Sequence, residues 1–219
     1  MSNILELFDK INPLSFLNEN EPGGLNEIIL CNQINPEADF AIIALGQDTD
    51  PIRKEFYNLK KHNNTLKIID LGNLKRGQTP KDTYFALGEV CAFLLRHKII
   101  PIILGGDNDN AIGMYKGYEQ IGQIINIANI DSRIDLKELT LDADKNNYLA
   151  HIFCSDPNYL FNYTHLCYQS YFVETDMLKL LQDIRFENYR LGEIQNNLED
   201  AEPLIRNCDM LLADINAIR

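Results

Sequence analysis

The sequence lacks a Cys-x-x-Cys pair, a long apolar run and a basic leader. It has five cysteines, Cys31, Cys91, Cys154, Cys167 and Cys208. Four of the five lie in apolar or helical stretches. A reduced cysteine in such a setting is usually a small core residue. No apolar run approaches the roughly 18 residues of a membrane span, and no basic residues precede an apolar core near Met1, so we expect neither a membrane segment nor a signal peptide. These absences predict a cytoplasmic protein.

Positive charge is scarce as well. Lys and Arg number 20 against 32 Asp and Glu, which gives a formal net charge of −12. Binding to nucleic acid requires clustered basic side chains that displace counterions from phosphates, so we expect no nucleic-acid partner. The same charge argues against an anionic membrane surface and is typical of a soluble acidic exterior. The 45% apolar and 24% charged fractions, over 219 residues, predict a globular chain with one large core.

Strand and helix patterns alternate along the chain. Apolar runs typical of buried strands lie at residues 40–46, 66–71, 99–104, 124–131 and 209–216, and weaker strand candidates lie at 148–153 and 169–173. Helical periodicity is found at 4–11, 51–59, 80–98, 110–122, 174–186 and 193–206, the last interrupted near Pro203. This order predicts a three-layer α/β/α sandwich with a mainly parallel sheet, as a single domain over 1–219 with 1–37 as an N-terminal extension.

Two short polar motifs follow predicted strands. Residues 105–108 read Gly-Gly-Asp-Asn, and residues 129–135 read Asn-Ile-Asp-Ser-Arg-Ile-Asp. A third, Asp-Ile-Asn at 214–216, lies at the tip of the last predicted strand. Because parallel sheets hold ligands and metals at the carboxyl ends of their strands, these motifs mark the candidate site.

The motifs resemble those of the ureohydrolase family of arginases, agmatinases and formimidoylglutamases. Those enzymes hold two manganese ions with Gly-Gly-Asp-His, Asp-x-His-x-Asp and a later Asp-x-Asp. The segments 50–53 and 69–73 also look like the family, and 167–173 and 189–193 look like its formimidoylglutamase-like branch. The resemblance covers roughly residues 38–219 and implies an arginase-like fold.

The resemblance carries over six metal-ligand positions, of which half are retained. The retained positions are Asp131, Asp135 and Asp214, whereas Asn108 and Arg133 replace histidines and Asn216 replaces an aspartate. Neutral asparagine is a poor ligand, and arginine cannot ligate a metal because it stays protonated. The resemblance therefore implies a degenerate metal site, with no cofactor expected, or manganese or another divalent ion if the protein is active.

Alternate residues of a strand share a face, so Arg133 would project beside Asp131 and Asp135 if the strand continued. We therefore hypothesise that the Arg133 guanidinium replaces the metals as an internal counter-ion. Two alternatives stay open. Asp131 could be an ordinary turn or cap residue, or the three aspartates could hold a single Mg²⁺ or Ca²⁺.

Other chemistry-bearing residues carry weaker signals. His151 is interpreted as a core or rim histidine rather than a proton shuttle, and His62, His97 and His165 as surface or helix-end residues. The glycines of 105–106 lack the sequence of a phosphate loop. We assign no catalytic residue, because neither a Ser-His-Asp nor a Cys-His arrangement is visible, and the substrate-binding residues are unknown.

Family members continue beyond the position of Arg219 through a further strand and helices, so the C-terminal part of the family fold is expected to be missing. That strand would lie beside the one leading to Gly105. The chain would then be a fragment, or another chain would fill the gap, or the strand order would differ.

Two functional hypotheses follow. In the first, the protein is a non-catalytic ureohydrolase-family member with a binding or scaffold role, as a homo-oligomer or with a protein partner. In the second, it is a metal-dependent hydrolase of linear amidines with an altered metal site.

Overall fold

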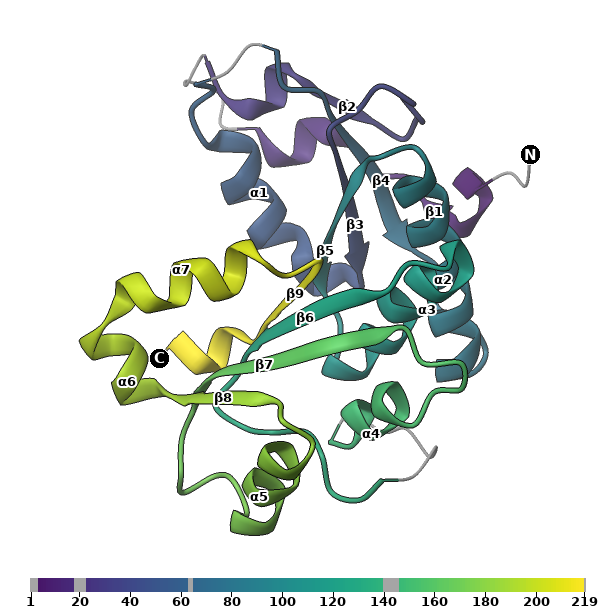
Figure 1. Cartoon of the computed structure of the whole chain (residues 1–219). Coiled ribbons are helices and arrows are strands. Elements are labelled where there is room, and N and C mark those ends of the chain that lie inside the picture. Colours follow the sequence, from purple (N-terminus) through teal and green to yellow (C-terminus); the bar gives the residue numbers. More distant parts are fainter. Residues whose placement is uncertain (1–3, 18–22, 63–64, 140–145, 219) are drawn as a thin grey trace. The chain divides into compact units, whose positions relative to one another are not determined.

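The computed structural model describes residues 4–17, 23–62, 65–139 and 146–218. The chain divides into two compact units, residues 1–121 (unit 1) and 122–219 (unit 2), and each is described by itself. In both units helices flank mostly parallel strands (Figure 1), so the predicted α/β class is confirmed. The single-domain organisation stays a prediction.

Unit 1 is built on a mostly parallel sheet in the order β1-β4-β3-β5, with β2 also paired to β4. Its strands are β1 (Phe8–Asp9), β2 (Ile29–Cys31), β3 (Phe40–Leu45), β4 (Ile68–Leu74) and β5 (Ile100–Gly105). Only β1 runs antiparallel to its neighbour among these pairings. The register places Leu45, at the end of β3, beside Gly105, at the end of β5.

Helices cover both faces of this sheet. They are α1 (Asp50–Asn58), α2 (Pro80–Arg96) and α3 (Ala111–Ile121), with short 3-10 turns η1 (Ile4–Leu7), η2 (Pro13–Phe16), η3 (Leu25–Glu27), η4 (Gln47–Thr49) and η5 (Asn108–Asn110). Successive strand residues point to opposite faces. Ile43 accordingly packs with Leu87 of α2, whereas Ile42 packs with Tyr57 of α1. Unit 1 is therefore layered helix, sheet, helix.

A buried ion pair fixes α1 to β4. The guanidinium of Arg53 donates from Nε to Asp70 Oδ2 at 2.8 Å and from Nη2 to Asp70 Oδ1 at 3.2 Å, and both residues are 0% exposed. Asp70 also accepts the Tyr57 hydroxyl at 2.9 Å and the backbone N–H of Gly72 at 2.9 Å. The carboxylate oxygens are thus satisfied by four donors, as a buried charge requires.

Unit 2 contains a parallel sheet in the order β8-β7-β6-β9. Its strands are β6 (Ile125–Ile130), β7 (Leu160–Tyr168), β8 (Glu187–Arg190) and β9 (Met210–Ala213), and its helices are α4 (Tyr148–Phe153), α5 (Thr175–Asp183), α6 (Leu191–Asn196), α7 (Leu198–Arg206) and the 3-10 turn η6 (Ile215–Ile218). The ring of Tyr163 packs edge-on against Phe153 of α4, with centroids 5.3 Å apart. On the opposite face Leu166 packs with Ile194 of α6 and Ala201 of α7.

The structure corrects several predicted elements. Residues 148–153 form helix α4, not a strand, because a six-residue apolar run fits either state. The predicted strand at 169–173 is absent from the described structure, which places β7 at 160–168 instead, where polar side chains interrupt the apolar pattern. Residues 4–11 form η1 and β1 rather than one helix. The break in 193–206 falls at Asn197, and Pro203 lies inside α7.

None of the described helices combines the length and the apolar character needed to cross a bilayer.

Candidate functional site

Two of the predicted ligand positions lie at neighbouring strand tips in unit 2. Asp131 directly follows β6 and Asp214 directly follows β9, and these strands pair in parallel. The Asp214 backbone N–H donates to the carbonyl of Ile130 at 2.9 Å, and the Asp131 N–H donates to Leu166 of β7 at 3.0 Å. Both aspartates are therefore fixed to the carboxyl edge of the same sheet, where the sequence placed the candidate site.

The three retained aspartates influence one another electrostatically. Asp131 is 2% exposed and Asp135 is 7% exposed. Burial raises the pKa of Asp131 to about 6, and the negative charges of Asp135 and Asp214 act in the same direction. Backbone hydrogen bonds from Arg133 and Ser132 partly oppose this rise in the pKa of Asp131. Asp135 and Asp214 are thus close enough to Asp131 to influence its pKa, and the assignment of the three aspartates as metal ligands stays a prediction.

Both strand-tip aspartates also serve as turn residues. Asp131 Oδ1 accepts the backbone N–H of Arg133 at 3.0 Å, and Asp214 Oδ1 accepts the backbone N–H of Asn216 at 2.7 Å. An aspartate that caps the backbone two residues ahead forms an Asx turn. The turn role that the sequence left open for Asp131 is therefore real.

The counter-ion hypothesis for Arg133 is wrong. The side chain is exposed, and its guanidinium carbon lies over the ring of Phe172, 4.5 Å from the ring centroid. Among the described residues, the ion pairs do not include Arg133. The reason is geometric: β6 ends at Ile130, so residues 131–135 leave strand geometry and the alternation used to place Arg133 does not hold.

The two other replaced positions are described within their own units. Asn216 belongs to η6 and is exposed, with its backbone rather than its side chain capped by Asp214. Asn108 opens η5 in unit 1, at the end of the turn after β5, so its surroundings are described separately.

The turn before Asn108 requires its glycines. Gly105 and Gly106 have φ values of +72° and +84°, in the left-handed region that side chains other than glycine avoid. A Cβ on Gly105 would lie 2.5 Å from Thr49 Cγ2, and one on Gly106 would lie 2.9 Å from the Leu45 side chain. The Gly-Gly pair is thus explained by backbone conformation and close packing in unit 1, whatever ligand the turn faces.

A buried polar network supports the unit 2 site and was missed by sequence reasoning. His165, predicted to be a surface or helix-end residue, is 0% exposed in β7. Its Nε2 is hydrogen bonded to the carbonyl of Asp131 at 3.0 Å, and its Nδ1 to the Tyr163 hydroxyl at 2.8 Å. Asn129 in turn donates to the hydroxyls of Tyr163 and Tyr148 at 3.2 and 3.0 Å. Burial lowers the pKa of His165 to about 4, so the ring is neutral at physiological pH.

The signal that would have located His165 is its alternation with Tyr163 along β7, since both side chains then face α4. His151, the other histidine considered, lies in α4 and is half-buried, which matches the interpretation as a core or rim residue.

Arg133 does not fit as a ligand of the manganese pair that the sequence resemblance implies. Manganese prefers carboxylate and imidazole ligands, and the guanidinium at Arg133 is permanently protonated and directed onto Phe172. In the part of the chain that the structure describes, no three His, Cys, Asp or Glu side chains are grouped so that they could hold a metal ion.

Comparison with known proteins gives a family match and structural neighbours. The Arginase family model matches residues 32–197. Trypanosoma cruzi formiminoglutamase, solved with Mn²⁺, superposes with a TM-score of 0.65 and 18% identity, covering 90% of this chain and 72% of that one. Formimidoylglutamase from Bacillus subtilis superposes with a TM-score of 0.67 and 13% identity, covering 90% of this chain and 70% of that one. Agmatine ureohydrolase of Thermoplasma volcanium superposes with a TM-score of 0.63 and 14% identity, covering 89% of this chain and 71% of that one. At these identities the likeness to solved structures shows the fold alone. No curated protein sequence matches.

Proposed function

This chain belongs to the arginase family, and from that premise we propose that it is a non-catalytic member that has lost the binuclear manganese site and has a binding or scaffold role. We further propose that it acts as a homo-oligomer or with a protein partner, and not on nucleic acid, in keeping with its net charge of −12.

One observation carries this proposal. Arg133 stands at a position where the family places a metal-binding histidine, and its guanidinium lies over Phe172 instead of facing Asp131. A side chain that is always protonated offers no lone pair to a metal. Asn216 removes a second ligand charge, because a neutral amide stands where the family has a carboxylate. The loss is thus distributed over two strand tips of unit 2, rather than confined to one substitution.

A second function, hydrolysis of a linear amidine at an altered metal site, is favoured by a different observation. The pKa of Asp131 is raised to about 6 by burial and by the charges of Asp135 and Asp214. A divalent cation bound there would relieve that repulsion and restore the ionised carboxylate. Manganese is the metal to test, since the neighbouring T. cruzi enzyme was solved with it. In this reading the amidine C–N bond is cleaved by water.

Metal content and product formation distinguish the two functions. Purified protein is incubated with Mn²⁺, desalted and analysed for bound metal. It is then assayed for formamide from N-formimidoyl-L-glutamate and for urea from L-arginine and agmatine. The proposal expects neither stoichiometric manganese nor product. Manganese at one or two ions per chain together with formamide or urea would contradict it and establish the hydrolase.

Restoring the lost ligands provides a gain-of-function test. The triple variant Asn108→His, Arg133→His, Asn216→Asp is expected to bind Mn²⁺ more tightly than wild type, because imidazole and carboxylate replace groups that cannot ligate. The matched control adds Asp131→Asn to the same triple variant and should lose the gained affinity. Equal Mn²⁺ binding by the triple variant and its control would mean that Asp131 is not part of a vestigial site.

A further inference from the structure

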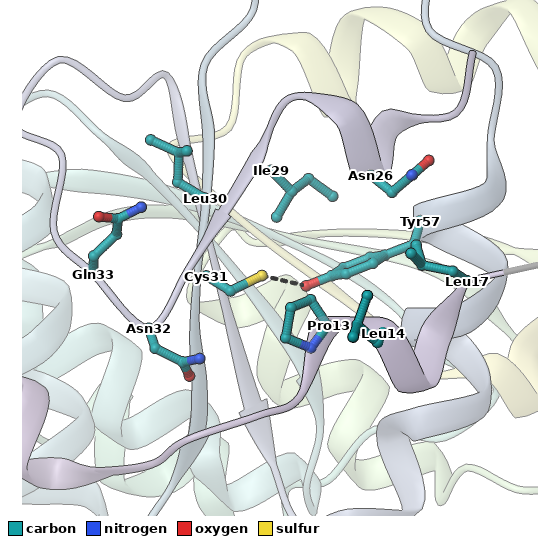
Figure 2. Close-up of a pocket in the computed structure, with 10 residues that line it drawn as sticks. All are labelled: Pro13, Leu14, Leu17, Asn26, Ile29, Leu30, Cys31, Asn32, Gln33 and Tyr57. Atoms are coloured by element: carbon teal, nitrogen blue, oxygen red, sulfur yellow. Dashed lines mark hydrogen bonds between the residues drawn. The ribbon is translucent and has the colours of Figure 1, made fainter. Parts of the chain in front are cut away.

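A cavity of about 430 Å³ opens in unit 1, between η2, β2 and α1. Figure 2 shows the thiol of Cys31 and the hydroxyl of Tyr57 directed toward each other at its centre, with Pro13 and Leu14 of η2 on one side and Ile29 of β2 on the other. The Cys31 Sγ and the Tyr57 hydroxyl oxygen are 3.3 Å apart. The volume lies within the range of about 300–1,000 Å³ typical of small-molecule sites.

The lining of the cavity carries no formal charge at neutral pH. Its walls are aliphatic, and its polar groups are amides, one thiol and one phenol. Burial raises the pKa of the Cys31 thiol, so that group stays protonated. Burial and the Asp70 carboxylate likewise raise the pKa of Tyr57. The chain has 24% charged residues, but none of them lines this surface. An ionised ligand would lose its hydration here without gaining an ion pair, so the cavity excludes ionised ligands.

The walls of the cavity are held in place by hydrogen bonds, so the space is preformed. Asn32 is bonded to the backbone of Ile11 twice, accepting its N–H at 2.9 Å and donating to its carbonyl at 2.8 Å, which ties the end of β2 to the segment before η2. Asn58 of α1 donates to the carbonyl of Phe16 at 2.9 Å. Tyr57, which forms the floor, is anchored by the Asp70 carboxylate. A site that needs no rearrangement binds its ligand without the entropic cost of ordering its walls.

Two polar side chains in the lining are available to a ligand. The amides of Asn26 and Gln33 make no hydrogen bond to other residues that the structure describes, and they lie at opposite ends of the cavity in Figure 2. An amide offers both a donor and an acceptor, so it matches a hydroxyl or an amide on the ligand.

We propose that this cavity binds a neutral organic molecule with an aliphatic or aromatic body and a hydroxyl or amide head group. The body contacts Leu14, Leu17 and Ile29, and the head group bonds to Asn26 or Gln33. This site is independent of the strand-tip aspartates, so it stands whether or not the protein hydrolyses amidines.

The test compares three probes with the same ring on the full chain. Cyclohexanol is neutral, cyclohexanecarboxylate is anionic and cyclohexylammonium is cationic. Binding is followed by NMR of isotope-labelled isoleucine and leucine methyl groups. Cyclohexanol is expected to shift the methyl resonances of Leu14 and Ile29 in a saturable manner at millimolar concentration, and the two charged probes are not. Absence of a saturable shift with cyclohexanol, or equal shifts with a charged probe, would overturn the proposal without any variant.

A matched pair of variants locates the site. Leu14→Trp places an indole at the mouth of the cavity and should weaken cyclohexanol binding by about tenfold or more. Leu198→Trp makes the same change on α7 in unit 2 and should leave binding unchanged. The two leucines are equally exposed, at 71% each, so neither change disturbs the core. Equal affinity of both variants would place the bound probe elsewhere and refute the assignment.

Discussion

Replacing Asp70 by asparagine should destabilise unit 1 severely, although the two side chains have almost the same shape. Arg53 and Asp70 are both 0% exposed, and Asp70 accepts two hydrogen bonds from Arg53, one from Tyr57 and one from Gly72. In the Asp70→Asn variant the guanidinium stays charged and buried while its partner is neutral. The new amide N–H₂ also faces donors rather than acceptors.

The size of the effect follows from this burial. Removing one partner of a buried ion pair typically costs about 3–5 kcal/mol, because the other charge remains without compensation. Asp50, also 3.3 Å from Arg53, is 52% exposed and so compensates little. Against a usual total stability of about 5–15 kcal/mol, the loss is about a fifth or more. In urea this corresponds to a lower unfolding midpoint by roughly 1–5 M at unchanged slope.

Urea unfolding followed by circular dichroism measures the midpoint and the slope for each variant. The control is Glu37→Gln, which breaks the ion pair with Lys67 at 2.7 Å, whose side chains are 77% and 50% exposed. Because water screens that pair, the control should unfold at the wild-type midpoint. If Asp70→Asn costs less than about 1 kcal/mol, the buried-charge argument is refuted.

Three further predictions concern the site and its surroundings. The pKa of His165 falls from 6.5 to about 4 on folding, so the folded state favours the neutral ring. The free energy of unfolding should therefore be at its full value above pH 6.5 and should decrease as the pH falls from 6.5 toward 4. The decrease in stability is at most about 3 kcal/mol. The His165→Gln variant should show a flatter dependence of stability on pH when urea unfolding is measured across that range. Gly105→Ala should destabilise more than Gly122→Ala in thermal unfolding. Both glycines have positive φ, but a Cβ on Gly105 would meet Thr49, whereas Gly122 has open space. Arg133→Gln should cost about 1 kcal/mol or less, the value of a cation–π contact. A loss of several kcal/mol in urea unfolding would contradict the assignment of the Arg133 guanidinium to the Phe172 ring.

Much of the architecture was determined by the sequence itself. Apolar runs marked β3, β4, β5, β6 and β9, because the strands of a parallel sheet are rich in Val, Ile and Leu. The same runs predicted that Asp131 and Asp214 lie at strand ends, and only the structure shows that these two strands are neighbours. Elements whose patterns mix polar and apolar residues were not predicted, and β7 with His165 is the clearest case.

Only the tertiary structure decided which long side chains meet. Arg53 and Asp70 are 17 residues apart, and their pairing depends on how α1 packs on β4. Arg133 lies over Phe172 because the chain leaves β6 before that residue and returns through the segment after β7. Local patterns express the preferences of adjacent residues for a face of a strand or helix. The direction of a flexible charged side chain depends on which distant surfaces the fold brings within its reach.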